Sequence, residues 1–177
     1  NPGRKLTMTF PKSVGQIPLY YAHKNTGRPL KEGKWFEKFR SNYLDVDNDA
    51  LYPFGYGLSY TTFRFSDITL NRSSIGMDNE LVASVTVTNT GDCAGSEVVQ
   101  LYIRDLVGSV TRPVKELKGF EKIYLQPNES RTVRFTIAPE MLKFYNADLK
   151  FVAEPGDFDV MIGPDSRNVK TARFTLR

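Results

Sequence analysis

The chain has 177 residues, of which 40% are hydrophobic and 25% are charged, a balance that supports a packed core and argues against disorder. Its 24 basic and 20 acidic residues give a formal charge of +4. Because the two signs are interspersed, the one-sign stripe of a nucleic-acid-binding surface is not expected. The length suits one domain, or one domain with a piece of another.

The cysteine content and the lengths of the apolar runs exclude further classes of protein and of site. The single cysteine, Cys93, excludes an internal disulfide and any multi-cysteine metal site. No apolar run reaches membrane-spanning length and no signal-peptide pattern opens the chain, so no membrane partner is expected. The first residue is Asn1 rather than methionine, and we therefore expect a processed product or an excised fragment.

Residues 1–60 show little repeating structure. One short strand is predicted where Leu6, Met8 and Phe10 alternate with threonines before a proline. Residues 20–29 mix aromatic and polar side chains without a period and are expected to form a loop. Because one strand and a loop cannot bury their own apolar faces, we expect this region to pack against a folded unit outside the chain.

Residues 34–43 predict one or two helical turns, with Trp35, Phe36 and Phe39 on one side. Aromatic planes also suit the axial C–H faces of sugar rings. Packing against a neighbouring domain is the alternative, and it is favoured. The candidates for sugar stacking are Trp35, Phe36, Tyr20 and Tyr21.

Residues 52–63 are rich in aromatics interrupted by one proline and two glycines. Pro53 fixes its own backbone and favours an extended residue before it. Gly55 and Gly57 permit backbone angles or close approaches that side chains forbid. We expect an interdomain seam in which the aromatics bury large apolar areas. Its contact residues are Tyr52, Phe54, Gly55, Tyr56, Gly57, Leu58 and Tyr60.

From residue 61 onward, apolar residues recur at every second position, which predicts strands. The runs are 81–88, 99–104, 132–137, 158–162 and 172–176. A strand at 115–124 and a hairpin through 145–150 bring the count to seven or eight, and Pro139 opens the only expected helical turn. The pattern is typical of a mainly β immunoglobulin-like or fibronectin type III-like β-sandwich over residues 61–177. Absence of the immunoglobulin cysteine pair favours the fibronectin-like variant.

Two of these strands change parity. Between residues 63 and 70 the apolar positions move from odd to even, and around Gly119 they move from Leu117 to Phe120. One extra residue in each ladder, a β-bulge, would keep both halves of each strand facing the core.

Candidates for chemistry are few. His23 is the only histidine, and as a metal ligand it would need carboxylate partners; a loop or interface role is the favoured alternative. Cys93 stands in a polar turn without a histidine neighbour, so we interpret it as a small side chain rather than a nucleophile.

Asp45, Asp47 and Asp49 have the opening spacing of a calcium-binding loop. Ala50 and Tyr56 stand where that loop requires glycine and the closing glutamate, so a solvated acidic turn is favoured and Ca²⁺ is the minor option. The sequence therefore predicts no catalytic residue, metal site or cofactor within this chain.

Several motifs follow one another in a fixed order. They are NPGRKLTMTFP at 1–11, VGQIPLYY at 14–21, HKNTGRP at 23–29, LYPFGYGLSY at 51–60, VTVTNTG at 85–91, EVVQLY at 97–102, RPVKELKGF at 112–120 and EPG at 154–156. This series resembles glycoside hydrolase family 3 over essentially the whole chain. Residues 1–60 are similar to the closing segment of that family's α/β second domain, and residues 61–177 to its fibronectin-like third domain. Gly3 and Arg4 stand where Ser-Gly is common.

The resemblance implies a retaining β-glucosidase, periplasmic or secreted, that hydrolyses terminal β-D-glucosyl residues. In that family the nucleophile is an aspartate on an N-terminal (β/α)₈ barrel and the acid/base is a glutamate of the second domain; both precede this chain. The retaining mechanism needs two carboxyl groups about 5 Å apart. No residue here matches either motif, so the chain alone is expected to be inactive.

Three roles remain open. In the first, the seam clamps the sandwich to upstream catalytic domains of the same enzyme. In the second, residues 25–49 form a lip of the active site for the β-glucoside substrate. In the third, the chain is a carbohydrate-binding or adhesion module without hydrolase activity, with Trp35, Phe36 and Tyr43 as its candidates. The substrate-adjacent candidates of the second role are Arg28, Trp35, Arg40 and Tyr43.

Overall fold

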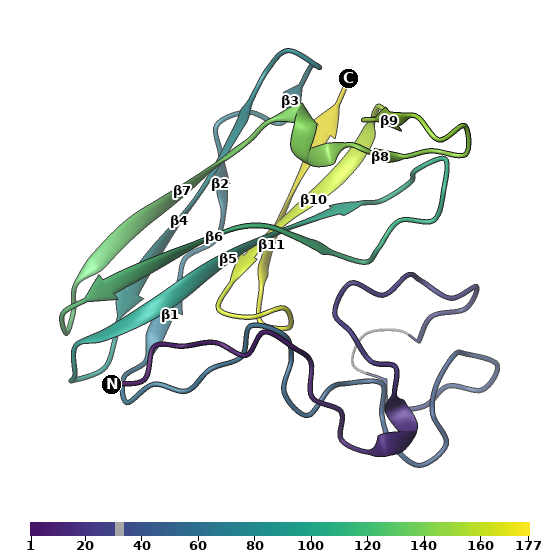
Figure 1. Ribbon diagram of the computed structural model, residues 1–177. Coiled ribbons are helices and arrows are strands. Elements are labelled where there is room, and N and C mark those ends of the chain that lie inside the picture. The colour runs from purple at the N-terminus through teal and green to yellow at the C-terminus, as the bar shows by residue number, and fades with distance from the viewer. Residues whose placement is uncertain (31–33) are drawn as a thin grey trace.

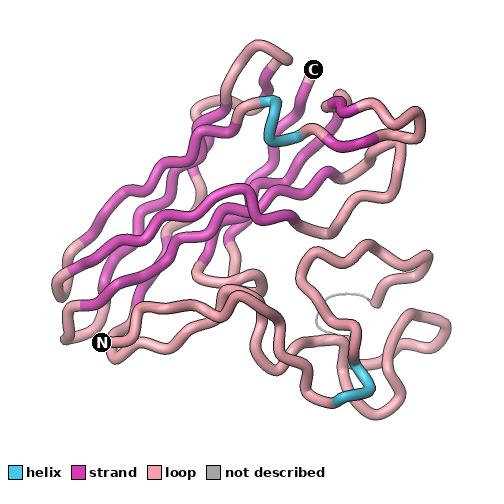
Figure 2. The backbone as a smooth tube through the Cα atoms, in the orientation of Figure 1, coloured by secondary structure: helices cyan, strands magenta, loops and turns pink. Residues whose placement is uncertain are grey.

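A β-sandwich stands above a layer of loops in the computed structural model, which describes residues 1–30 and 34–177 (Figure 1). The sandwich comprises the chain from Phe63 onward. The loop layer is the N-terminal part, and the one regular element among its described residues is the short 3₁₀ helix η1 (Val14–Gln16) (Figure 2). Within the described ranges, no helix is long and apolar enough to cross a membrane.

The first sheet is centred on β4 (Leu81–Asn89). On one side β4 pairs antiparallel with β7 (Ser130–Ile137). On the other side it pairs with two short strands in succession, β1 (Phe63–Phe65) and β2 (Thr69–Leu70).

The second sheet has five strands in the order β3-β11-β10-β5-β6. Its members are β3 (Ser74–Ile75), β11 (Lys170–Leu176), β10 (Gly156–Gly163), β5 (Gly95–Asp105) and β6 (Glu116–Leu125). All neighbours are antiparallel except β3 and β11, which run parallel. The 3₁₀ helix η2 (Pro139–Leu142) and the hairpin of β8 (Phe144–Tyr145) and β9 (Phe151–Val152) lie at one end of the sandwich.

The core lies between the two sheets and is built from the alternating apolar residues. In β4 every second side chain from Leu81 to Val87 is buried, and the rings of Phe158 and Phe174 stack at 5.4 Å between centroids. Aligned sheets packed through such alternating positions form a β-sandwich. The predicted fold class is therefore confirmed. The strand count is higher than predicted, because short pieces such as β1, β2 and β3 are separate strands.

Both predicted irregularities are present. Phe65 pairs with Val87 but Thr69 pairs with Ser84, so four steps along one strand match three along the other. The β5–β6 ladder likewise skips Lys118, because Leu101 pairs with Gly119 and Tyr102 with Leu117.

The prediction that Phe120 faces the core is wrong. Its side chain is 69% exposed. A β-carbon on Gly119 would lie 3.6 Å from the ring of Phe135, so Gly119 takes the core-facing position and the residue after it points outward.

Two predictions for the N-terminal part are also wrong. Residues 6–10 do not form a regular strand: Phe10 bridges to Tyr52 and Leu6 N donates to Tyr56 O, but between them Phe54 O accepts from Ser166 N instead, and Gly55 adopts a φ of 80°. Residues 34–43 form a turn closed by Arg40 N donating to Glu37 O at 3.2 Å, and Phe39 at a φ of 64° cannot continue a helix.

Candidate functional site

The N-terminal loops cover part of the outer face of the second sheet, around β5 and β10. On β5, Gln100 and Tyr102 occupy the positions that alternate with the core residues, and both are buried. Met161 on the neighbouring strand β10 is buried as well. The N-terminal loops therefore pack on the sandwich itself, and the expected packing against a unit outside the chain stays a prediction.

Aromatic rings form the centre of this contact. Tyr21 stacks on Phe54 at 4.5 Å between ring centroids and meets Tyr102 edge-on at 5.7 Å. The Tyr21 hydroxyl also accepts a long hydrogen bond from Leu117 N, at 3.4 Å. Burial raises the pKa of Tyr102, so its hydroxyl is neutral and donates to Gln100 Oε1 at 2.5 Å. Tyr21 is therefore engaged in packing rather than presented for a sugar.

Gly55 fits against the side chain of Gln100. The amide Nε2 of Gln100 donates to Gly55 O at 3.2 Å and to Pro164 O at 2.5 Å. Gly55 adopts a φ of 80°, and a β-carbon there would collide with the Gln100 amide. Both the left-handed backbone and the close approach require glycine at this position.

The turn between β10 and β11 also holds the segment that contains Phe54 and Gly55. The buried carboxylate of Asp165 accepts hydrogen bonds from Arg167 N and Asn168 N, each at 2.8 Å, and so fixes the turn. Ser166 N then donates to Phe54 O at 2.9 Å, and the Arg167 guanidinium donates to Ala50 O.

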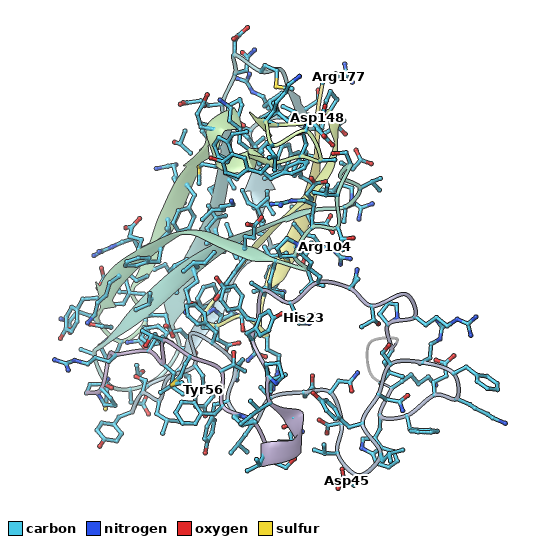
Figure 3. All side chains as sticks on the ribbon, turned by 45° about the vertical axis from the view of Figure 1, so that its right-hand side comes forward. His23, Asp45, Tyr56, Arg104, Asp148 and Arg177 are labelled. Atoms are coloured by element: carbon cyan, nitrogen blue, oxygen red, sulfur yellow. The ribbon has the colours of Figure 1, made fainter. Side chains whose placement is uncertain are left out.

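Two further contacts fasten the ends of the loop layer. The Lys5 ammonium lies 2.6 Å from a carboxylate oxygen of Glu97, and both side chains are largely buried. Val114 N donates to His23 O at 2.9 Å, which ties the loop after β5 to the N-terminal segment. The contact between the N-terminal loops and the sandwich therefore extends from the first residues of the chain to His23. Figure 3 shows His23 at the place where the loops meet the sandwich.

The predicted seam residues divide into two groups. Phe54, Gly55 and Tyr56 are buried or half-buried, and Gly57 lies where a β-carbon would meet Arg4 O at 2.7 Å. Tyr52 is 40% exposed, although its ring stacks on Tyr56 at 5.0 Å. Leu58 is 69% exposed and Tyr60 is 79% exposed. The segment thus has one side on the sandwich and one side open.

Two adjoining hollows lie in the loop layer. The larger, of about 590 Å³, is lined by residues from 18–30 and 41–49. The smaller, of about 240 Å³, lies beside the sandwich and includes Ser166 and Arg167 in its lining. They share five lining residues, Leu19, Tyr20, His23, Asn48 and Asp49. We call the combined feature the loop groove.

Of the four substrate-adjacent candidates, only Tyr43 lines the loop groove. Its hydroxyl donates to Gln16 O at 2.9 Å. Arg40 pairs with Glu37 at 3.4 Å, Trp35 lies exposed beside Phe36, and Arg28 is exposed. The proposed lip at 25–49 includes residues 31–33, which lie outside the described residues.

The acidic turn at 45–49 is held by a lysine. The Lys12 ammonium lies 2.6 and 2.7 Å from the two carboxylate oxygens of Asp47, and this hydrogen bonding lowers the pKa of Asp47. Among the described residues, no three His, Cys, Asp or Glu side chains group as metal ligands. The His23 ring contacts Lys24 O through Nδ1, and Cys93 is exposed.

Sequence reasoning missed three buried polar residues, one within the loop layer and two on β5. Gln16 is fully buried: its amide donates to Asp47 O and Asp49 O at 2.9 and 3.1 Å and accepts from Lys12 N. The alternation of β5 places Gln100 and Tyr102 opposite its core residues and by itself indicates no further role for them. A tyrosine at an outward position of a central strand was the available signal, because a large amphipathic ring is more often covered than solvated.

The comparisons with known proteins agree with this architecture. A family model described as "Fibronectin type III-like domain" matches residues 97–166. The chain is 54% identical to a periplasmic β-glucosidase of Salmonella typhimurium over 176 residues, which are 99% of this chain and 23% of that protein. It is 46% identical to a putative β-xylosidase of Formosa agariphila, covering 100% of this chain and 22% of that protein.

A solved structure gives the same result. The β-glucosidase from Listeria innocua in complex with glucose superposes with a TM-score of 0.93 and 43% identity, over 99% of this chain and 24% of that chain. The chain thus spans less than a quarter of the length of the relatives it matches. It is similar to the C-terminal, fibronectin type III-like portion of β-glucosidases of glycoside hydrolase family 3.

Proposed function

We propose that the chain is the non-catalytic C-terminal portion of a retaining β-glucosidase that hydrolyses terminal β-D-glucosyl residues, and that it supports the catalytic domains of the same polypeptide. The observation that carries the proposal is similarity over 99% of this chain to 23% of a β-glucosidase. The catalytic carboxylates would then lie in the remainder of the polypeptide, and the chain alone would be inactive.

The two-sided loop layer supports an architectural role. One side of residues 1–60 is fixed to the sandwich through Phe54, Gly55 and Lys5. Other residues of the layer expose apolar side chains, which on a folded protein can mark a contact surface when they lie together. They are Met8, Phe10, Leu51, Tyr52, Leu58 and Tyr60. In this proposal they contact the upstream domains, so that residues 1–60 complete an α/β domain and residues 61–177 form the sandwich.

Rigid docking matters because catalysis depends on position. A displacement of about 1 Å in a catalytic group can lower the rate roughly 100-fold. A layer fixed to the sandwich by Gln100 on one side and by Ser166 on the other would hold the upstream domains at a constant distance.

The specificity for the terminal sugar that is released is expected to lie elsewhere in the polypeptide. One relative is named a β-glucosidase and another a putative β-xylosidase, yet both match this chain at its full length. A portion shared by proteins named for different sugars fits a supporting role. The name of the first relative also supports a periplasmic or secreted location.

The test is to express the complete gene product and, separately, the 177-residue chain, and to assay both on p-nitrophenyl β-D-glucoside. We expect activity from the complete product and none from the chain. Hydrolysis by the chain alone would overturn the non-catalytic role. An inactive complete product would overturn the β-glucosidase assignment, and a carbohydrate-binding or adhesion module would then be tested by calorimetric titration with cello- and laminari-oligosaccharides.

A further inference from the structure

The loop groove has the size of a small-molecule binding site. Its larger hollow, of about 590 Å³, lies within the range of roughly 300–1,000 Å³ typical of small-molecule sites. It extends from Ser166 at the sandwich to Tyr43 in the loops. Five residues shared by the two hollows, including Tyr20, His23 and Asp49, make it continuous.

Tyr20 supplies an aromatic surface in the groove. Its side chain is 54% exposed, and within residues 1–30 and 34–177 no second aromatic ring stacks on it. Its neighbour Tyr21 stacks on Phe54 and is used in packing. A tyrosine that is left open beside a packed one offers a flat apolar face together with a polar tip.

His23 and Asp49 supply hydrogen-bond acceptors. The Nδ1 of His23 lies 3.1 Å from Lys24 O, and because a carbonyl oxygen only accepts, Nδ1 carries the hydrogen. In the tautomer with its hydrogen on Nδ1, the ring has Nε2 as an acceptor. In the described part of the chain, no hydrogen bond or ion pair engages the carboxylate of Asp49, whereas Lys12 holds that of Asp47.

The charges in the groove favour a neutral ligand over an anionic one. At the sandwich end, Lys115 donates to Ser166 O and Arg167 to Ala50 O, so main-chain oxygens already engage both cations. Lys24 is the further lysine in the described lining, and the carboxylate of Asp49 has the opposite charge. Phosphate or sulfate recognition would instead need cations presented together toward the ligand.

We propose that the loop groove binds a neutral β-linked gluco-oligosaccharide, namely the sugar residues of a substrate that lie beyond the bond being cleaved. A sugar ring would stack one C–H face on Tyr20, and its hydroxyls would donate to Asp49 and to Nε2 of His23. The part of this proposal that concerns the enzyme's substrate rests on the proposed function. The part that concerns sugar binding rests on the loop groove alone.

The test uses the complete polypeptide and compares kcat/KM on cellotetraose with kcat/KM on p-nitrophenyl β-D-glucoside. We expect Tyr20→Ala to lower the value for cellotetraose about tenfold, mainly through KM, and to leave the value for the short substrate unchanged. Tyr20→Phe keeps the ring and should retain the wild-type ratio. Asp49→Asn, which removes the charged acceptor, should lower the ratio about five- to tenfold.

A matched control is Tyr124→Ala on β6, because Tyr124 is 53% exposed and lies outside the groove lining. It should change neither value. Equal losses on both substrates, or no change in the ratio for Tyr20→Ala, would overturn the groove assignment. Equal losses together with a lower melting temperature would show that upstream domains cover the groove instead.

A second measurement separates this proposal from the proposed function. If the complete polypeptide hydrolyses neither substrate, the β-glucosidase assignment fails, and binding is then measured by calorimetric titration with a sulfur-linked cellotetraose analogue that glycosidases do not cleave. Binding that Tyr20→Ala weakens about tenfold and Tyr124→Ala does not would uphold the groove. Absence of binding to the wild-type polypeptide would overturn it.

Discussion

The two faces of strand β5 are both buried, but different chemistry buries them. Val99, Leu101 and Ile103 face the sandwich core, where they meet other apolar side chains and have no polar atoms to satisfy. Gln100 and Tyr102 face the N-terminal loops, where each polar atom needs a partner at a defined position. The core side therefore tolerates many apolar arrangements, whereas the loop side depends on a few hydrogen bonds and one glycine.

This difference predicts how the two regions fail. Removal of a core ring should lower the free energy of unfolding of the whole sandwich. Disruption of the loop contact should release residues 1–60 and leave the sandwich folded, because the strands do not use the loops as ladder partners.

The largest effect is expected for Phe158→Ala. The ring is fully buried against Phe174, and loss of such a ring costs about 3–5 kcal/mol through lost transfer energy and the cavity left behind. Urea denaturation followed by circular dichroism should show one cooperative transition at lower urea. A decrease in the free energy of unfolding below about 1 kcal/mol would show that the core repacks. The predicted difference between the core side and the loop side of β5 would then be wrong.

Gly55→Ala should cost about 3 kcal/mol, because it combines a left-handed backbone with a collision against Gln100. The expected result is rapid proteolysis within residues 1–50 while the sandwich stays resistant. Gly27→Ala is the matched control, because no atom lies within 4 Å of its β-carbon position and its φ is not positive. Equal proteolysis of the two variants would contradict the role of Gly55 in the contact.

Phe54→Ala should cost about 2 kcal/mol. Its ring stacks on Tyr21 but is only half-buried, so the loss is smaller than for a core ring. Leu58→Ala, at an exposed position of the same segment, should stay within about 0.5 kcal/mol in the 177-residue chain. In the complete polypeptide, a larger loss for Leu58→Ala than in the chain would indicate that upstream domains cover it.

The smallest effects, below about 1 kcal/mol, concern two aspartates whose pKa values move in opposite directions. The hydrogen bond from Lys12 lowers the pKa of Asp47 below its ordinary 3.8, so the ionised form stabilises the fold above that pH and the contribution disappears as the pH falls through the folded pKa. Asp47→Asn should thus lower the melting temperature at pH 7 and have no effect near pH 2.

Asp105 should behave in the opposite way. Burial raises its pKa; Oδ2 has no hydrogen bond within the described residues, and Arg112 Nε lies 4.0 Å away, with Glu116 and Glu154 also nearby. The charged form therefore destabilises the fold above the raised pKa and is relieved by protonation below it. The stability of Asp105→Asn relative to wild type should be greatest at pH 7 and decline toward pH 3, as melting temperatures across that range would show. A difference in melting temperature between Asp105→Asn and wild type that does not change with pH would contradict this explanation.

Local signals predicted most of the sandwich. Alternation located the long strands, and two parity changes located the extra residues near 66–68 and at Lys118. The same signals failed at Phe120, because Gly119 carries no apolar side chain yet occupies the core-facing position. They failed again at residues 34–43, where aromatic spacing suggested a helix but Phe39 adopts a left-handed backbone.

The candidate site was much less predictable. Of the substrate-adjacent candidates, Tyr43 lines the loop groove and Arg28, Trp35 and Arg40 do not, and their place near a substrate stays a prediction. Tyr20 was named among the aromatics, yet nothing in its neighbours distinguishes it from Tyr21. Only the contact of Tyr21 with Phe54, more than thirty positions away, separates the packed ring from the open one.

The sequence by itself determined the β-sandwich, because a period of two is a property of neighbouring residues and specifies which side of each strand is apolar. Only the tertiary structure decided that the polar side of β5 is also covered. That contact joins residues far apart in the chain, Gln100 to Gly55 and Arg167 to Ala50. Whether such groups meet depends on how the loops cross the finished sheet, and no local pattern encodes that path.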